Sequence, residues 1–402
     1  MALLSVADAL ERVLAHAEPL PAEEAPLAEA DGRVLVYALK ALRTQPPADV
    51  SAMDGYAVRA DDVEEAPVRL KIIGEVAAGR PFTHSVGHGE AARIFTGGVI
   101  PPGADTVVIQ ELSKRDGDFV EVEQPTAKGR HIRVGGLDFK AGDLLLNAGH
   151  RLSARDLALA AAMNHPLVPV HRRPKVALFA TGDELVPPGT EPGPGQIVSS
   201  NTFALAALAR GEGAEAVDLG IVRDRLDDTI AVVRRARELD ADILVTSGGA
   251  SVGDYDLVQP ALAAEGMALS FWKLALRPGR PLMHGRLGTM HVLGVPGNPV
   301  SAFICAFLFL VPLIRRLAGR SDLGFETETA TLAYDLPAND ERADYLRATL
   351  SDGPRGPVAT PFPIQDSSMM APLAKADCLI VREPYARALK AGSRCAIVKF
   401  DR

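Results

Sequence analysis

A glycine-rich loop followed by two carboxylates is the part of this sequence that most directly indicates chemistry. Residues 243–245 predict a buried strand, and the chain then enters a loop almost free of bulky side chains. Glycine lets the backbone approach a ligand closely and turn its N–H groups toward an anion. Asp254 and Asp256 follow, and carboxylates hold cations or orient water. The loop therefore predicts a phosphate or oxyanion site at the end of a strand, contacted by Ser247, Gly248, Gly249, Ser251 and Gly253.

Three other loop types share part of this pattern. The glycine spacing fits a Walker A loop, but Asp254 stands where that loop requires lysine, and Ala250 interrupts the dinucleotide pattern. Residues 249–253 do match the nucleophile elbow of serine hydrolases, with Ser251 as the nucleophile. Its histidine would be His284 or His291. A hydrolase and a plain strand-to-helix turn both stay open on this evidence.

Polar loops follow three further predicted strands. Glu184 comes after the strand at 176–179, and Asp224 comes after the strand at 216–221. The loop after the strand at 291–295 contains Pro296, Asn298 and Pro299, which fit the start and N-cap of a long helix. Because parallel strands end at one edge of a sheet, we expect these loops to gather there with the glycine loop.

Three cations lie close together in sequence, at Lys273, Arg277 and Arg280. A Pro-Gly turn separates the two arginines and would present both guanidinium groups outward. Paired N–H donors of this kind suit tetrahedral oxyanions, although a salt-bridged surface is the alternative.

Strands and helices alternate along the part of the chain that carries these loops. From 171 to 320 the pattern predicts a doubly wound, mostly parallel α/β sheet, ending in a helix at 299–317. Short β runs fill 44–147 and return from 321 to 402, and the helical periodicity of 1–43 resumes at 148–170. We therefore expect a β domain inserted within a helical unit, then the α/β domain, then a second β domain.

Composition excludes several classes of protein. The net charge of -8 and the 5% aromatic content argue against a nucleic-acid binder. Three cysteines without paired spacing argue against a disulfide framework or zinc site, and they fit a cytoplasmic protein. Residues 3–14 predict an amphipathic helix rather than a signal peptide. The apolar run at 302–314 is too short to span a bilayer, so we expect a core helix and no membrane contact.

Six blocks of this chain together resemble the molybdopterin molybdenumtransferases, the family of bacterial MoeA and the gephyrin E-domain. The blocks are 51–59, 96–97, 181–184, 247–256, 271–281 and 293–301. The resemblance implies an elongated helical domain, an inserted β domain, a MogA-like α/β domain and a C-terminal β barrel. It implies a homodimer whose active cleft combines both subunits. The implied reaction uses Mg²⁺, inserts molybdenum from molybdate into adenylylated molybdopterin and releases AMP.

The resemblance also implies roles for individual residues. Asp54 and Thr96 match functional positions of the inserted domain, and Glu184, Asp224 and Asp256 match catalytic acids that hold magnesium. Substrate-binding positions match at Lys273, Pro296 and Pro299, and at Arg277 and Arg280, where the family commonly has lysine. Arg347 and Ser367 match molybdate-binding positions. Asn298, which lies between the two prolines, is expected to contact the substrate from the N-cap of the long helix.

Two other functions within this resemblance stay open. A MogA-like molybdopterin adenylyltransferase would share the α/β domain without needing the long flanking β regions. A gephyrin-like scaffold would be the non-enzymatic alternative. The transferase would contact an adenylyltransferase and apo-molybdoenzymes transiently.

Overall fold

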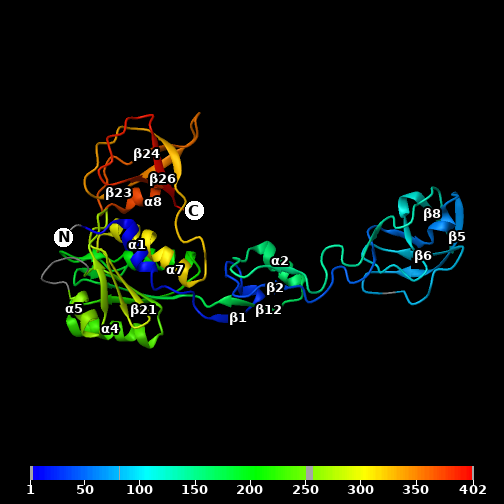
Figure 1. Ribbon diagram of the computed structural model, residues 1–402, viewed down its shortest axis with the longest axis horizontal. Helices are drawn as coiled ribbons and strands as arrows, with labels where there is room; N and C mark the ends of the chain where they lie inside the picture. The colour runs from blue at the N-terminus through cyan, green and yellow to red at the C-terminus, as the bar shows by residue number, and fades with distance from the viewer. Residues whose placement is uncertain (1–2, 81, 250–256, 401–402) are drawn as a thin grey trace.

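The computed structural model describes residues 3–80, 82–249 and 257–400, which form an elongated molecule (Figure 1). An α/β domain and a C-terminal β domain form a body at one end. A narrow arm leads away from this body, and an inserted β domain lies at the far end of the arm. The inserted domain is therefore well separated from the α/β domain of its own chain.

The α/β domain is built on a six-stranded sheet with the order β16-β13-β17-β21-β20-β18. Its strands are β13 (Lys175–Thr181), β16 (Glu215–Val222), β17 (Ile243–Ser247), β18 (Ala268–Trp272), β20 (Met283–Leu287) and β21 (Met290–Val295). The first four in this order are parallel, and β20 and β18 continue the sheet antiparallel. Alternate residues of β13 and β17 enter two different hydrophobic clusters, so both faces of the sheet are buried. The predicted doubly wound sheet is confirmed.

Helices cover both faces of this sheet. The helix α3 (Asn201–Gly211) and the long helix Pro299–Leu317 pack on one face, while α4 (Leu226–Glu238) and α5 (Val258–Ala264) pack on the other. The long helix consists of α6 (Pro299–Cys305), a π-helical turn η4 (Ala306–Leu310) and α7 (Val311–Leu317). The π turn lies beside Pro312, which has no backbone N–H for the helical ladder.

The long helix is the core helix that the sequence predicts. Its length and composition would allow it to cross a membrane, but 89% of its most apolar window is buried inside the protein. A first helix, α1 (Val6–Leu14), packs beside α7 and adds Ala9 and Val13 to the same cluster. This helix begins later than the predicted residue 3 because Ser5 caps it, accepting a hydrogen bond from the Asp8 N–H.

The arm joins two stretches of chain that are far apart in sequence. The strand β1 (Ala22–Pro26) pairs with β12 (Leu167–His171), and β2 (Leu39–Lys40) pairs with β11 (Leu144–Leu146). The arm also contains the 3-10 turn η1 (Leu27–Glu29) and the helix α2 (Ala154–Ala162), whose N-cap Ser153 forms a capping box with Asp156. Leu35 and Val170, one from each stretch, share a hydrophobic cluster.

Residues 1–43 contain fewer helices than their periodicity predicts. In the described part of this stretch α1 is the only α-helix, and it lies in the core of the α/β domain. The predicted domain boundaries therefore stay predictions, and we propose grouping α1 with the α/β domain.

The inserted domain is a six-stranded sheet with the order β7-β4-β6-β5-β9-β8. Its elements are β4 (Gly55–Val58), η2 (Ala60–Val63), β5 (Val68–Val76), β6 (Glu90–Ile94), β7 (Thr106–Ile109), η3 (Gln110–Leu112), β8 (Ser113–Asp116) and β9 (Phe119–Val122). The strand before this sheet, β3 (Val50–Ser51), pairs with the strand after it, β10 (Ile132–Arg133), where the chain enters and leaves the domain.

The C-terminal domain is a five-stranded β barrel. Its elements are β22 (Glu328–Leu332), β23 (Ala343–Ser351), β24 (Val358–Pro361), α8 (Met370–Lys375), β25 (Cys378–Arg382) and β26 (Arg394–Lys399). The order β23-β24-β22-β26-β25 closes because β25 also pairs with β23. A sixth strand, β19 (Leu276–Arg277), extends from the α/β domain and pairs with β23, which fastens the two domains together. All three cysteines are buried and free.

A buried histidine pair in the α/β domain predicts acid sensitivity. His284 on β20 and His291 on β21 are each 2% exposed, and their ring centroids lie 5.7 Å apart. Burial is the main cause that lowers the pKa of His284 to about 3 and that of His291 to about 4. An unfolded histidine titrates at about 6.5, so below that pH the unfolded state binds more protons than the folded state. The free energy of unfolding should therefore fall between pH 6.5 and pH 4, by roughly 2 kcal/mol per histidine at pH 5.

Urea unfolding at pH 7 and pH 5 measures this effect. The substitution His284→Leu keeps an apolar contact with Phe271 and should reduce the pH dependence by about half. An unchanged pH dependence in the variant would show that other groups cause the acid sensitivity.

Candidate functional site

The loop after β17 requires its two glycines. Gly248 and Gly249 have positive φ values of 91° and 62°. A Cβ atom would lie 2.5 Å from the Thr181 carbonyl oxygen if added at Gly248, and 2.3 Å from a Val258 methyl carbon if added at Gly249. No side chain can approach so closely, so glycine allows this loop to pack against the end of β13 and the start of α5. Ser251, Gly253 and Asp256, predicted in the same loop, lie outside the described residues.

Two carboxylates lie at the ends of neighbouring strands. Asp224 follows β16, and its Oδ1 accepts a hydrogen bond from the Thr181 hydroxyl at 2.5 Å. Glu184 follows β13, and its side chain has no hydrogen bond or ion pair with any residue that the structure describes. The first carboxylate is therefore fixed in orientation, while neither oxygen of the second has a partner in the described part of the chain.

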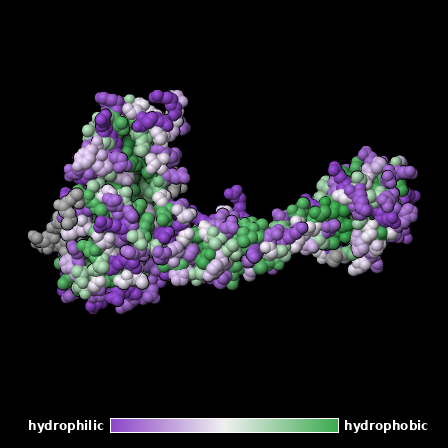
Figure 2. Space-filling model, in the orientation of Figure 1, coloured by the Kyte–Doolittle hydropathy of each residue, from purple (hydrophilic) through white to green (hydrophobic). Residues whose placement is uncertain are grey.

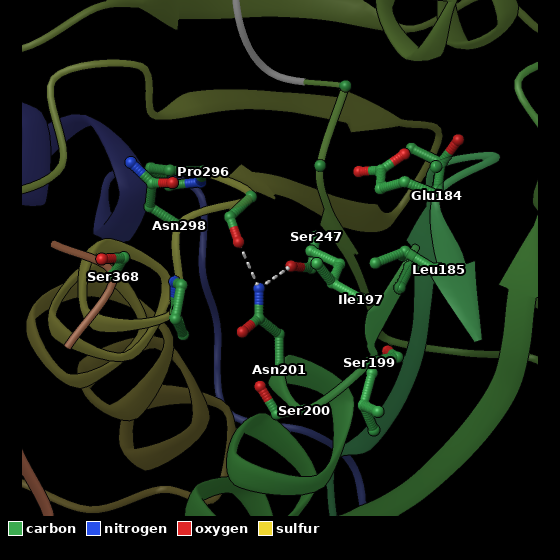
Figure 3. A pocket seen from close by; sticks show the side chains of 18 of the residues that line it. Glu184, Leu185, Ile197, Ser199, Ser200, Asn201, Ser247, Pro296, Asn298 and Ser368 are labelled. Atoms are coloured by element: carbon green, nitrogen blue, oxygen red, sulfur yellow. Dashed lines mark hydrogen bonds between the residues drawn. The ribbon is translucent and has the colours of Figure 1, made fainter. Parts of the chain in front are cut away.

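Two helices begin beside these carboxylates. Asn298 and Pro299 occupy the N-cap and first position of α6, as predicted. The helix α3 begins at Asn201, whose Nδ2 donates to Ser247 Oγ at 2.7 Å and to the Gly297 carbonyl at 2.8 Å (Figure 3). These two bonds tie the end of β17 to the loop after β21. Helix N-termini attract anions, so two of them favour a ligand with negative charge.

These groups surround a pocket of ≈ 680 Å³ at the carboxyl edge of the parallel strands. One wall is a two-stranded ribbon of β14 (Leu185–Val186) and β15 (Ile197–Val198), which presents exposed apolar side chains. The lining residues are Ala180, Thr181, Gly182, Glu184, Leu185, Ile197, Val198, Ser199, Ser200, Asn201, Asp224, Ser247, Gly248, Gly249, Pro281, Pro296, Gly297, Asn298, Pro299 and Ser368. An anion-attracting end beside an apolar wall suits a ligand that combines phosphate groups with a flat heterocycle.

The C-terminal domain supplies Ser368 to this pocket. The neighbouring Ser367 contacts α6 directly, because its Oγ accepts from Asn298 Nδ2 at 2.9 Å and its carbonyl accepts from the Val300 N–H at 3.0 Å. Arg347, predicted to bind substrate, is only 1% exposed and is not among the lining residues. Ser367 therefore lies at the edge of the pocket and Arg347 lies behind it.

The three predicted cations have different surroundings. Arg277 forms ion pairs with Asp344 and Asp340, and the bond to Asp344 is the main cause that raises its pKa. Because β19 pairs with β23 and sets Arg277 opposite Asp344, its guanidinium is paired with carboxylates although 42% of the side chain is exposed. The Lys273 ammonium lies 4.8 Å from the centre of the Trp272 ring.

Arg280 alone of these three has an exposed position beside the pocket. It precedes the lining residue Pro281, and its side chain has no hydrogen bond or ion pair with the described part of the chain. Among the described residues nothing pairs with its charge, so we propose that Arg280 contacts an anionic ligand.

Asp54 and Thr96 form a separate polar site in the inserted domain. Asp54 Oδ1 accepts hydrogen bonds from the Thr96 N–H at 2.7 Å and from the Thr96 hydroxyl at 2.8 Å. The backbone bond, followed by the hydroxyl bond, lowers the pKa of Asp54. The inserted domain lies at the opposite end of the molecule from the pocket (Figure 1). One chain therefore does not bring these two residues to the pocket.

Five polar lining residues were not predicted as site residues: Thr181, Ser199, Ser200, Asn201 and Ser368. A signal existed for three of them, because 199–201 is a run of polar residues where α3 begins. Neither histidine required by the hydrolase alternative lines the pocket, since His284 and His291 are buried in the sheet.

The two carboxylates of the pocket suit a magnesium ion. Mg²⁺ binds through one or two carboxylates together with substrate phosphates, and Glu184 and Asp224 provide two carboxylates in the pocket. Among residues 3–80, 82–249 and 257–400 no group of three His, Cys, Asp or Glu side chains is placed to hold a metal. The residues therefore fit an ion that shares its coordination with the substrate.

Comparisons with known proteins match nearly the whole chain. Family models for the MoeA N-terminal region (domain I and II), a probable molybdopterin binding domain and the MoeA C-terminal region (domain IV) match residues 4–164, 177–316 and 329–400. A molybdopterin molybdenumtransferase of Haemophilus influenzae is 33% identical, with 95% of each chain covered. One from a Nostoc species is 41% identical over 72% of this chain and 68% of the relative. The crystal structure of a molybdopterin biosynthesis MoeA protein from Pyrococcus horikoshii is 32% identical, covers 100% of both chains and has a TM-score of 0.84. This chain therefore belongs to the molybdopterin molybdenumtransferase family.

Proposed function

We propose that this transferase of molybdenum cofactor biosynthesis takes molybdenum from molybdate, inserts it into adenylylated molybdopterin and releases AMP. The observation that supports this most strongly is the pocket in the molybdopterin-binding region, where a glycine loop and two helix N-termini lie beside two carboxylates. Adenylylated molybdopterin contains a pyrophosphate, which such a loop and such helix ends bind. Its flat rings suit the apolar wall formed by Ile197 and Val198.

The two carboxylates support cleavage of the pyrophosphate. Glu184 and Asp224 would hold Mg²⁺ together with phosphate oxygens, and the ion would neutralise their negative charge. The Thr181 bond orients the Asp224 carboxylate, and the Glu184 carboxylate, which has no partner among the described residues, would orient a water molecule. Asp256 is proposed as the third acid from the resemblance, and it lies outside the described residues.

Arg280 is the proposed molybdate contact among the three cations, because its charge is available beside the pocket. The substitution Arg280→Ala should raise the half-saturating molybdate concentration about tenfold, as expected for the loss of one charged donor. The substitution Arg277→Ala should change that concentration less and reduce stability instead, because it leaves Asp344 buried and unpaired. Molybdate titrations of AMP release and urea unfolding measure both effects. Equal molybdate dependence in wild type and Arg280→Ala would contradict the assignment.

We propose a homodimer with composite clefts, in which Asp54 and Thr96 of one subunit complete the pocket of the other. Their distance from the pocket within one chain supports this arrangement (Figure 1). Hydrophobic residues on the arm support it as well (Figure 2), since Leu42 and Leu137 are 59% and 61% exposed. A second copy of the chain would cover such a surface.

Incubation of the purified protein with adenylylated molybdopterin, Mg²⁺ and molybdate tests the function. AMP should appear only when molybdate is present, and removal of Mg²⁺ should slow its release. A protein that instead consumes ATP and free molybdopterin would be an adenylyltransferase. We further propose a cytoplasmic location and transient contacts with the adenylyltransferase and with apo-molybdoenzymes.

A further inference from the structure

Arg93, on β6 of the inserted domain, contacts the neighbours of both members of the Asp54–Thr96 pair. Its Nη1 donates to the carbonyl of Gly55, the residue after Asp54, at 3.1 Å. Its guanidinium carbon lies 4.8 Å from the ring centre of Phe95, the residue before Thr96. Arg93 forms no ion pair with Asp54 itself. The arginine therefore reaches this polar site through the chain on either side of it.

A second connection to Asp54 runs through Gln110, which follows β7. Arg93 Nη2 donates to Gln110 Oε1 at 2.9 Å, and the Gln110 N–H donates to the Asp54 carbonyl at 3.0 Å. One guanidinium therefore holds two successive carbonyls of the turn, that of Gly55 directly and that of Asp54 through Gln110.

The sheet sets the position of this guanidinium. Arg93 lies opposite Tyr56 in the pairing of β6 with β4, and residues 93 and 95 share one face because side chains alternate along a strand. The guanidinium carbon lies 5.1 Å from the ring centre of Tyr56, which is only 4% exposed. Cations are attracted to the faces of aromatic rings. The rings of Tyr56 and Phe95 therefore hold the guanidinium beside the turn.

The turn packs tightly, and one oxygen of Asp54 depends on where the turn lies. A Cβ atom added at Gly55 would lie 2.0 Å from the Val108 carbonyl oxygen, so the turn fits closely against β7. Asp54 Oδ1 accepts both bonds from Thr96, whereas Oδ2 has no hydrogen-bond partner in the described part of the chain. A shift of the turn would therefore redirect Oδ2.

We infer that Arg93 is a positioning residue for the reaction, which holds the turn at Asp54 and Gly55 so that the Asp54 carboxylate keeps one orientation. Both terminal nitrogens of Arg93 already donate within the inserted domain, which favours this role over direct contact with a ligand. The inference rests on the proposed function where the test uses activity, and on geometry alone where the test uses hydrogen exchange.

The substitutions Arg93→Lys and Arg93→Met separate positioning from direct binding. Lysine keeps the charge but is a compact point donor, so it cannot replace the planar group that reaches both Gly55 and Gln110. For a positioning residue, Arg93→Lys should lower the AMP release rate at saturating substrates about tenfold, nearly as much as Arg93→Met. The half-saturating concentrations should change less than about twofold. A near-normal rate in Arg93→Lys would overturn the inference, and raised half-saturating concentrations in Arg93→Met would then indicate direct contact with an anionic ligand.

Combination with Asp54→Ala tests whether the loss acts through the carboxylate. In a protein that already lacks this carboxylate, adding Arg93→Lys should lower the residual AMP release less than about twofold, because both changes remove one function. Single turnovers with excess enzyme measure such low rates. A further tenfold loss would overturn the inference, since Arg93 would then act independently of Asp54.

Hydrogen exchange tests the same inference without activity. The Thr96 N–H donates to Asp54 Oδ1 and the Gln110 N–H donates to the Asp54 carbonyl, so the protection of both reports the position of the turn. Arg93→Lys should raise both exchange rates about tenfold or more while the interior of β4 stays protected. Unchanged rates, or equal loss of protection throughout β4, would overturn the inference. If wild type itself releases no AMP, the proposed function fails, and the exchange result still decides whether Arg93 holds the turn.

Arg69 provides a matched control in the same domain. It lies on β5, its guanidinium carbon is 4.4 Å from the ring centre of Phe119, and it pairs with Asp116 at 2.9 Å. The substitution Arg69→Lys should leave AMP release within about twofold of wild type and leave exchange at residues 96 and 110 unchanged. An equal loss of AMP release in Arg69→Lys and Arg93→Lys would overturn the inference, because general damage to the sheet would then explain both.

Discussion

Glu184→Gln should reduce AMP release by roughly a hundredfold or more, the usual effect of removing a group that positions water or a metal ion. The carboxylate lines the pocket and forms no hydrogen bond or ion pair with the described residues, so its charge stabilises no contact among them. Glutamine has nearly the same shape, and the folded protein should therefore keep its stability. The variant should also need more Mg²⁺ for half-maximal activity. A discontinuous assay of AMP with varied Mg²⁺ measures both quantities.

Glu191→Gln is the control for this prediction. Glu191 is exposed in the loop between β14 and β15 and does not line the pocket. Its neutralisation makes the same change in net charge and should leave AMP release within about twofold of wild type. Glu184→Gln with the activity and Mg²⁺ requirement of wild type would remove Glu184 from the mechanism.

The sheet and the edge that carries the site were predictable because both depend on local patterns. A strand buried on both faces must be apolar along its whole length, as 243–245 is, and parallel strands must end at one edge. The glycines at 248 and 249 could be recognised as site residues from their type. Positive φ and close packing at these two positions exclude residues with a Cβ atom. Asn298 and Pro299 were recognisable from the composition of helix starts.

The partners of the arginines were not predictable, because they depend on pairing between distant segments. Arg277 meets Asp344 only because a strand of the α/β domain joins the barrel, 67 residues further along the chain. Arg347 likewise meets a loop whose return path is set by barrel closure. In both cases the residue type suggested that the arginine binds an anionic ligand. In the fold, each guanidinium instead forms hydrogen bonds with other residues of the same chain.

The role proposed for the inserted domain depends on a second subunit, about which the sequence of one chain gives no direct information. Asp54 and Thr96 form a defined pair, yet the arm carries them away from the pocket. A sequence predicts which residues are polar and how they pair locally, whereas a site completed by another subunit depends on the symmetry of the assembly.

Two inactive variants should therefore restore activity when they are combined in one dimer. Asp54→Ala removes a group of the inserted domain, and Glu184→Gln removes a group of the pocket; each homodimer should be nearly inactive. In a heterodimer with composite clefts, one cleft carries both defects and the other carries neither. By this symmetry the heterodimer should show about half of the wild-type activity. AMP release from heterodimers purified through two different tags measures this directly.

A second pair of variants controls for nonspecific rescue. Glu184→Gln and Asp224→Asn both alter the same pocket, so a heterodimer of these two has one defect in every cleft and should stay nearly inactive. Rescue in the first pair together with none in the second requires that Asp54 and Glu184 act across the subunit boundary. Purified heterodimers of the first pair that remain inactive would contradict the composite cleft. The inserted domain would then influence the pocket only through its own arm.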